Sequence, residues 1–374
     1  MRFIAPNSAA TIDASRARGA DRMSADDSPR ASEIEGGSVA VLEGGDANTE
    51  RHAAVRAAAQ AVKVEVQRVK MLPHEEGPVP LATRVANAVG ILVPLLGLIV
   101  AIVLLWGVAF NWMYLALLMG MYLVTGLGIT VGFHRYFTHR SFKGPKWVTA
   151  LLGITGSAAM QGPVLEWVAV HRRHHECSDE EHDPHSPHTH GGGIAGAIGG
   201  AIHAHFGWLL SKKNSSYMRY VVDLQKDPVI RFIDKTFLVW VALGLVVPAA
   251  IAGLATMSWT GALLGMLWGG LVRIWMVHHI TWSVNSVCHI WGTRPYESGD
   301  HSRNNVIVGV LALGEGWHNN HHAFPASARH GLQWWQFDLS WICVWAMSKV
   351  GMAKEIRIPS EAKMKAKLKG AGAG

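Results

Sequence analysis

The sequence has little charge and almost no cysteine. Charged residues make up 16% of its 374 positions, well below the roughly 25% of an ordinary globular chain. Its 3 cysteines are too few for a disulfide framework. Phenylalanine and tyrosine are also scarce, at 10 and 6 residues. The missing cysteines exclude a disulfide-stapled secreted domain, and the apolar composition excludes a collagenous or wholly disordered chain.

The abundant residues are apolar residues, tryptophan and histidine. Hydrophobic residues make up 49% of the chain, which holds 16 tryptophans and 21 histidines. The net charge is +7, but no basic stripe carries interleaved aromatic residues, so we expect no nucleic-acid partner. A basic, apolar chain is better suited to the anionic surface of a lipid bilayer.

Four long apolar runs predict an all-α integral membrane protein. They cover about 85–107, 112–133, 237–256 and 259–279. About 20 apolar residues cross a bilayer core, so each run predicts a transmembrane helix. Short, uncharged connections join the runs in pairs, which predicts two transmembrane hairpins.

Some residues near these runs need a separate interpretation. The apolar stretch 147–160 is too short for a span and predicts an interfacial or buried helix. Arg273 lies close enough to the end of the fourth run to extend toward the membrane interface. The neighbouring His278 and His279 are interpreted as interfacial polar residues.

The rest of the chain predicts three parts. Residues 1–82 form a disordered N-terminal extension, 83–355 form the membrane domain, and 356–374 form a basic flexible tail. Within the membrane domain, 134–236 and 280–355 form a polar helical cap. Lysine and arginine avoid both hairpin connections, so the positive-inside rule places the cap and both termini in the cytoplasm. In a bacterium this would be a multi-pass protein of the inner membrane.

Histidines recur at ligand spacing in three clusters. His134 and His139 lie five residues apart, and HxxHH boxes occupy 171–175 and 318–322. On an α-helix the three imidazoles of an HxxHH box share one face, so two boxes can enclose two metal ions. His134 and His139 are about 140° apart on the same geometry, which suits a turning helix end or ligands of different metals. Spacing alone leaves iron, zinc, copper and nickel open.

The segments around the boxes resemble the membrane-bound fatty acyl desaturases of the acyl-CoA, or delta-9, type. The similar segments are 132–142, 166–175, 285–289 and 314–325. Segment 327–332, followed by Trp334 and Trp335, is similar to the bacterial and plant branch of the family. The resemblance covers about 83–360.

This resemblance implies a non-haem diiron centre in a histidine-rich cytoplasmic cap, with O₂ as co-substrate. It implies nine histidine ligands: His134, His139, His171, His174, His175, His289, His318, His321 and His322. It also implies that Asn285 holds a metal-bound water. Ligating imidazoles usually donate their second N–H to a carboxylate. The carboxylates expected to fill that role are Glu166, Asp179, Asp183 and Glu315, unless they pair with Arg140, Arg172 or Arg173.

The implied reaction introduces a cis double bond into a saturated acyl chain carried by CoA, a carrier protein or a glycerolipid. No fused redox module is visible, so we expect a separate electron donor: a ferredoxin, a flavoprotein reductase or a cytochrome b5-like protein. The residues expected to contact substrate are Gln161, Trp167, Thr281 and Trp282 along an apolar tunnel, with Lys212 and Lys213 near a carrier phosphate.

Two other functions and one departure from the family remain open. A lipid or alkane hydroxylase uses similar boxes, although at other spacings. A metal transporter would explain the histidine-rich loop 182–190, but its ligands should lie within the spans. The glycine-rich segment 188–200 looks like an insertion and is expected to form a flexible loop over the catalytic face.

Overall fold

The computed structural model describes residues 76–105, 111–211, 213–215 and 218–370. The described residues all belong to one compact unit, which covers 73–374. The predicted disordered extension 1–82 therefore lies almost wholly outside the described residues.

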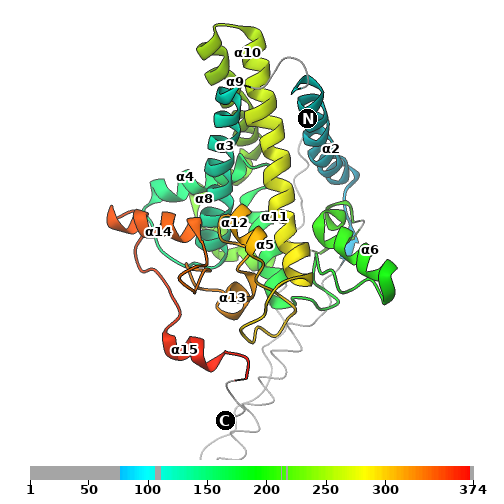
Figure 1. The fold of residues 1–374 in the computed structure, drawn as a ribbon, viewed down its shortest axis with the longest axis vertical. Coiled ribbons are helices and arrows are strands. Elements are labelled where there is room, and N and C mark those ends of the chain that lie inside the picture. Colours follow the sequence, from blue (N-terminus) through cyan, green and yellow to red (C-terminus); the bar gives the residue numbers. More distant parts are fainter. Residues whose placement is uncertain (1–75, 106–110, 212, 216–217, 371–374) are drawn as a thin grey trace, which may run out of the picture. The chain divides into compact units, whose positions relative to one another are not determined.

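Within the part of the chain that the structure describes, four helices are long and apolar enough to cross a membrane, as predicted (Figure 1). The first is α2 (Leu81–Leu105), and the third is α9 (Phe237–Thr256). The second consists of α3 (Trp112–Leu127) and the π-helical η1 (Gly128–Thr138). The fourth consists of α10 (Trp259–Gly265), the π-helical η4 (Met266–Val272) and α11 (Arg273–Ile290). The second and fourth continue past their predicted ends at 133 and 279, and these extensions carry His134 and His289.

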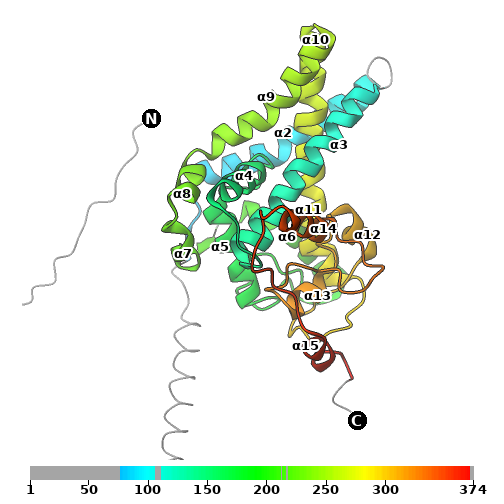
Figure 2. The same ribbon diagram turned by 90° about the vertical axis from the view of Figure 1, so that its left-hand side faces the viewer.

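The fourth helix holds the other three together. Its η4 segment packs against α2, α3 and α9, while α10 packs against α9 to form a hairpin. In Figures 1 and 2 the long helices extend to one side, and the shorter helices gather around their other ends. The connection between α2 and α3 passes through 106–110, outside the described residues.

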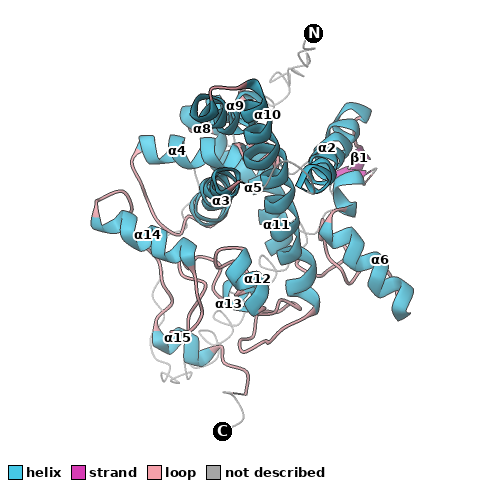
Figure 3. Ribbon diagram, turned by 45° about the horizontal axis from the view of Figure 1, so that its top comes forward, coloured by secondary structure: helices cyan, strands magenta, loops and turns pink. Residues whose placement is uncertain are grey.

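The remaining elements are short and nearly all helical (Figure 3). Before α9 they are β1 (Glu76–Pro78), α4 (Lys146–Ser157), α5 (Val164–Glu176), α6 (Gly193–His205), η2 (Gly207–Leu210), β2 (Lys213–Ser215), η3 (Met218–Val221), α7 (Val222–Gln225) and α8 (Pro228–Lys235). After α11 they are α12 (Val306–Leu311), α13 (His318–Ala323), α14 (Leu339–Lys349) and α15 (Glu361–Ala366). The all-α prediction thus misses one small antiparallel pairing, between β1 and β2.

The largest hydrophobic core lies where η1 meets the shorter helices. Phe133 and Phe137 of η1 are buried with Val148 of α4, Val168 of α5 and Ile233 of α8. The backbones of η1 and α4 come so close that a Cβ atom at position 128 would lie 2.3 Å from the Gly156 nitrogen. Glycine at 128 therefore permits the close approach that seats η1 in this core.

Several expectations about local structure are tested by these elements. The stretch 147–160 forms α4, a helix of 12 residues that is too short to span a membrane, as predicted. The expectation of a flexible loop over 188–200 is wrong from Gly193 onward, because α6 begins there and packs against α11. Tertiary packing outweighs the low helix propensity of its glycines. The segment expected to be a flexible tail contains α15, whose following residue Lys367 donates to Ala323 O at 2.7 Å.

Two residues predicted to reach the membrane interface are buried. Arg273 is 0% exposed and His278 is 4% exposed. Both hydrogen-bond to backbone carbonyls just after α4. The interfacial interpretation is wrong for both residues because these carbonyls replace water as hydrogen-bond partners inside the bundle.

Candidate metal centre

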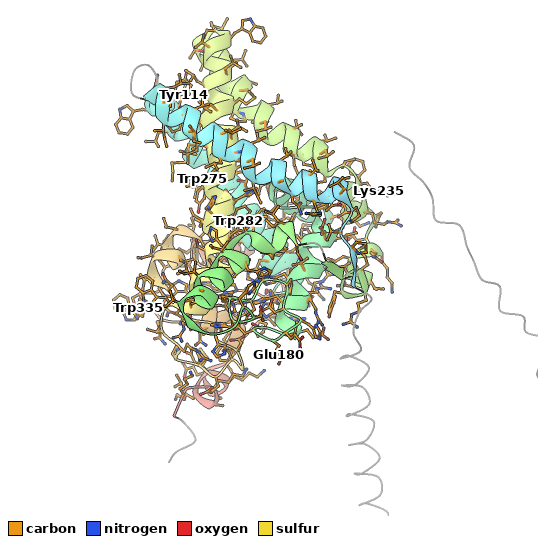
Figure 4. All side chains as sticks on the ribbon, turned by 90° about the vertical axis from the view of Figure 1, so that its right-hand side faces the viewer. Tyr114, Glu180, Lys235, Trp275, Trp282 and Trp335 are labelled. Atoms are coloured by element: carbon orange, nitrogen blue, oxygen red, sulfur yellow. The ribbon has the colours of Figure 1, made fainter. Side chains whose placement is uncertain are left out.

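The nine histidines implied by the sequence resemblance come together in two adjacent groups. One ring nitrogen from each member of a group lies within 4.8 Å of those of the others. The five-histidine group contains His134, His139, His171, His175 and His321. The four-histidine group contains His174, His289, His318 and His322. In Figure 4, Trp275 and Trp282 mark α11 as it descends toward the polar side chains of this region.

The π-helical geometry of η1 explains why His134 and His139 share a group. The His139 N–H donates to His134 O at 3.2 Å, a bond between residues five apart. Such a bond places residues i and i+5 above one another, whereas an α-helix would separate them by about 140°. Their ring centroids lie 4.8 Å apart. The two imidazoles therefore fall in one group, which agrees with the alternative of a turning helix end rather than with ligands of different metals.

The Nε2 atoms of the five-histidine group point toward one another. His134 Nε2 lies 3.0 Å from His321 Nε2, which lies 2.9 Å from His175 Nε2. His175 Nε2 in turn lies 3.1 Å from His171 Nε2. The group therefore draws its nitrogens from η1, α5 and α13, three elements far apart in sequence.

The four-histidine group joins α5, α11 and α13. His289 Nε2, from the end of α11, lies 3.0 Å from His318 Nε2 on α13. The rings of His318 and His322 are 4.3 Å apart, and His174 of α5 lies 5.1 Å from His322. All four side chains are buried.

Aspartates contact the outward nitrogens of the four-histidine group. His289 Nδ1 lies 2.9 Å from Asp179 Oδ2, and His174 Nδ1 lies 3.0 Å from both oxygens of Asp183. These contacts match two of the predicted carboxylate partners. His322 Nδ1 contacts a third aspartate, Asp300 Oδ2, which sequence reasoning missed. Its position in the loop after α11 gives no spacing signal that would have identified it.

Glu315, one of the expected carboxylate partners, contacts the five-histidine group within a buried network that was not predicted. Glu315 Oε2 lies 2.6 Å from His134 Nδ1 and 3.2 Å from His330 Nδ1. Its other oxygen accepts from Arg135 at 2.8 Å, and Arg135 also pairs with Asp338 at 3.1 Å. The His330 ring lies 4.4 Å from that of His321. Arg135 and His330 both fall in segments that resemble the family, but neither has ligand spacing.

Glu166 does not reach the centre. Its side chain is exposed on α5, and it contacts none of the nine imidazoles in the described part of the chain. Five residues separate it from His171, which places it about 140° away around the helix. Its predicted role as an imidazole partner is wrong for this geometric reason. Arg172 instead pairs with Asp223, and Arg173 pairs with Glu176.

Burial keeps most of these imidazoles neutral. Desolvation, reinforced by neighbouring histidines, lowers the pKa of His139, His171, His175, His318 and His321 well below the ordinary value. Desolvation also lowers the pKa of His322, to about 4, although Asp300 acts against it. For His174, desolvation is outweighed by Asp183, and the pKa is raised. A neutral imidazole is the form that binds a metal.

The donor set fits metal ions. His134 and His289 each direct Nδ1 at a carboxylate, which assigns the ring proton there and leaves a lone pair on Nε2. Each of these lone pairs faces a second imidazole nitrogen at 3.0 Å. Without a metal such a pair can share an N–H···N hydrogen bond, and with both rings neutral and turned toward a cation the same nitrogens can bind it. In addition, the buried Nε2 atoms of His139, His174 and His322 have no hydrogen-bond partner. The two groups can therefore hold metal ions.

An apolar cavity opens beside both groups. Its wall includes His134 and His171 from the five-histidine group and His318 from the four-histidine group. The other lining residues are Tyr122, Gly126, Ile129, Thr130, Trp167, Val277, Ile280, Thr281, Val284, Asn285, Ala312, Leu313 and Glu315. A cavity that is mainly apolar with a few polar groups at the metal end suits an acyl chain.

Only some of the residues expected to contact substrate lie at the cavity. Trp167 and Thr281 line the cavity, and Gln161 bridges them through hydrogen bonds of 3.3 Å and 3.0 Å. Trp282 is buried but does not line this cavity, and its ring lies 4.9 Å from that of His278. Lys212 and the side chain of Lys213 lie outside the described residues.

Comparisons with known proteins agree with this geometry. The sequence profile of the fatty acid desaturase family matches residues 109–341. A hex-5-enoyl-[acyl-carrier protein] acetylenase from Moorena producens (strain JHB) is 43% identical over 277 residues, which are 74% of this chain and 86% of that protein. An sn-1 stearoyl-lipid 9-desaturase from Anabaena variabilis is 41% identical over 253 residues, 67% of this chain and 86% of the relative.

A relative from a plant acts on an acyl-CoA according to its name. An icosanoyl-CoA 5-desaturase from Limnanthes douglasii is 41% identical over 251 residues, 66% of this chain and 65% of that protein. The relatives from bacteria and plants confirm the resemblance to that branch of the family. The matched region contains all three histidine clusters and His289. This chain therefore belongs to the fatty acid desaturase family and is an oxidoreductase.

Proposed function

We propose that this chain is an O₂-dependent desaturase that introduces a cis double bond, at the delta-9 position, into a saturated fatty acyl chain. The observation that carries the proposal is the convergence of nine imidazoles at an apolar cavity. An acyl chain in that cavity passes beside His134, His171 and His318. Its methylene groups would thus lie next to both metal positions.

We assign the metals as two irons, one in each histidine group. Asn285, which lines the cavity, completes the four-histidine group through a water molecule. The irons supply, when bound, the activation of O₂ that breaking an unactivated C–H bond requires. The protein's own carboxylates Asp179, Asp183 and Glu315 orient the imidazoles that would bind the irons.

The overall reaction is balanced by an external donor. The acyl chain gives up two hydrogens with two electrons, and the donor supplies two more electrons with two protons. Together these reduce O₂ to two waters. The donor is a separate ferredoxin, flavoprotein reductase or cytochrome b5-like protein. The relatives' names include acyl-carrier protein, lipid and CoA substrates, so each of these carriers is a candidate for this chain.

We also propose how the chain lies in the bilayer. The four candidate spans form two hairpins of the membrane domain 83–355, with the cap and both termini in the cytoplasm. The long helices leave the bilayer at the ends that carry His134 and His289. This proposal rests on the positive-inside rule, because lysine and arginine concentrate in the cap and the tail. Modification of single cysteines introduced near residue 258 and in the tail, with a membrane-impermeant reagent, tests it.

The decisive experiment is lipid analysis of a host that expresses this chain, by gas chromatography with double-bond location. A new cis alkene at carbon 9 supports the proposal. An alcohol would instead indicate a hydroxylase, and an alkyne would indicate an acetylenase. Metal analysis of the purified chain is expected to give two tightly held irons. Zinc bound weakly through 182–190 would favour a transporter and contradict the proposal.

A further inference from the structure

The turn between α4 and α5 is held by side chains from the fourth long helix. Arg273 donates from Nη1 to Ala158 O at 2.8 Å. His278 Nε2 lies 3.1 Å from Ala159 O and 2.9 Å from Met160 O. Met160 has a positive φ of 62°, which is uncommon for a residue other than glycine. We call the two side chains and these three carbonyls the carbonyl clamp.

The Arg273 guanidinium is surrounded by backbone carbonyl oxygens that accept its hydrogen bonds, and no carboxylate pairs with it among the described residues. Its Nη2 donates to Gly244 O of α9 at 2.8 Å, and its Nε donates to Gly269 O at 3.2 Å. In a regular helix Gly244 O would accept from the N–H of residue 248, but Pro248 has no N–H. Ala158 is the C-cap of α4, where helix carbonyls also lack partners. Arg273 therefore satisfies carbonyls that the fold leaves free on two other helices.

The packing around this arginine leaves little room. A Cβ atom at position 244 would lie 2.9 Å from Ala158 O and 3.0 Å from Arg273 Nη2. Glycine at 244 thus allows α9, the end of α4 and the guanidinium to meet. The position of the turn is set by three helices rather than by the loop itself.

His278 fixes the next part of the turn. It is 4% exposed, and both of its acceptors are carbonyl oxygens, so Nε2 must carry the proton. Its ring packs 4.9 Å from that of Trp282. The neighbouring His279 points elsewhere, because its Nδ1 lies 3.0 Å from His205 Nε2.

The clamp leads directly to the wall of the acyl cavity. Gln161 follows Met160 and donates to Thr281 Oγ1 at 3.0 Å. Trp167 Nε1 donates to Gln161 Oε1 at 3.3 Å, and the Trp167 ring stacks on His171 at 5.2 Å. Trp167 and Thr281 both line the cavity. A movement of the turn would therefore move two wall residues beside the metal groups.

We propose that Arg273 and His278 are positioning residues that select which acyl carbon is oxidised. By fixing the Ala158–Met160 carbonyls they fix Gln161, and through it the spacing between Trp167 and Thr281. This spacing sets how far the acyl chain advances past the metal groups. The inference rests on the proposed desaturase function, and it adds two residues that neither touch substrate nor bind metal.

The test compares His278→Leu, His278→Gln and His279→Leu in the same host. Leucine removes the donor, whereas the glutamine amide can still donate to the carbonyls. For His278→Leu we expect the proportion of a neighbouring positional isomer to rise about tenfold, the effect of one lost hydrogen bond. His278→Gln and His279→Leu are expected to keep the wild-type isomer. Arg273→Lys, which keeps the charge but loses donors, is expected to shift the isomers as His278→Leu does.

A second measurement does not depend on turnover. Hydrogen exchange of backbone amides in peptides covering 158–167 should accelerate about tenfold in purified His278→Leu and stay unchanged in His279→Leu. A lower yield of an unchanged isomer, or unchanged exchange, would overturn the proposal. If the wild type makes no alkene, the desaturase proposal fails, and the exchange result shows separately whether the clamp exists.

Discussion

The two HxxHH boxes have identical spacing and opposite memberships. On α5, His171 and His175 belong to the five-histidine group, and His174 crosses to the other. On α13 the outer pair belongs to the four-histidine group, and His321 crosses over. In both boxes the i, i+4 pair belongs to one histidine group and the i+3 residue belongs to the other. Under the proposed metal assignment, each box would supply two ligands to one metal and one ligand to the other.

The two groups differ in their surroundings as well. Aspartates contact three members of the four-histidine group, through Asp179, Asp183 and Asp300. In the five-histidine group, His134 contacts Glu315, whose charge is shared with Arg135. The group with fewer nitrogens thus has more negative charge around it. We infer that a metal ion in the four-histidine group would lie in the more negatively charged environment of the two.

The largest expected effect comes from the outer histidines of the boxes. His171→Ala and His318→Ala each break an i, i+4 pair, in different groups. We expect alkene formation to fall below detection in both, while each variant keeps the metal of its intact group. Lipid analysis and metal content per chain measure the two outcomes. His182→Ala is the control, because His182 is exposed and belongs to neither group. Full activity in either box variant would contradict the metal assignment.

Carboxylate variants test the difference in surroundings. Asp300→Asn and Glu315→Gln remove a charge beside His322 and His134, respectively. We expect each to weaken its own metal position by about 10–100-fold, as seen for outer partners of metal ligands. Metal titration of the purified variants measures this. Glu166→Gln serves as the control because Glu166 is exposed and away from the imidazoles. Equal loss of both metals in each variant would remove the distinction between the groups.

Asn285 tests whether the four-histidine group is completed from the cavity side. Asn285→Ala is expected to keep both metals, because all nine imidazoles remain. Alkene yield should fall about tenfold, at the low end of the effects of removing an outer partner. The comparison of metal content with lipid product measures both. Loss of a whole metal would show that Asn285 contributes more than a water-mediated contact.

Acid should destabilise the folded chain gradually. Desolvation by burial lowers the pKa of His322 and His330 to about 4 from the ordinary 6.5. Between pH 6.5 and 4 the unfolded chain binds protons that the folded chain does not. The free energy of unfolding therefore decreases as the pH is lowered through this window. His174, whose pKa is raised, opposes this trend, as do Glu166 and Asp234, whose pKa values are raised by burial. The pKa of Asp179, lowered to about 2 by His289 despite desolvation, matters only below this window. Thermal unfolding in detergent at a series of pH values measures the slope.

Much of this site could be predicted because ligand spacing in the boxes is local. A helix of 3.6 residues per turn puts the three imidazoles of HxxHH on one face. Residues 171–175 and 318–322 can therefore be recognised as candidate metal ligands from the sequence alone. Four spans were equally visible, since about 20 apolar residues have few alternatives to crossing a bilayer. The membership of each histidine was not visible, because it depends on how α5 and α13 face each other.

What escaped prediction depends on departures from regular geometry or on distant contacts. The π-helical η1 brings His134 and His139 together, and no residue preference in the sequence predicts a π-helix there. Asp300 and His330 arrive from loops whose paths only the tertiary structure determines. Glu166 was expected to accept from an imidazole because it is a carboxylate near His171. Its position around the α5 helix instead directs its side chain away from the histidine groups. Arg273 was predicted to extend toward the membrane interface, because two of its three carbonyl partners, Ala158 O and Gly244 O, come from distant parts of the sequence.

The second and fourth long helices run without interruption from the membrane-crossing segments into the metal groups. One ends just beyond His134 and the other just beyond His289, with each imidazole in a different group. A sliding of one rod past the other would change the separation of the two metal positions. Under the proposed membrane arrangement, a change in the thickness of the surrounding lipid would act on the same two helices. The spacing of the two histidine groups would then depend on the bilayer as well as on the protein.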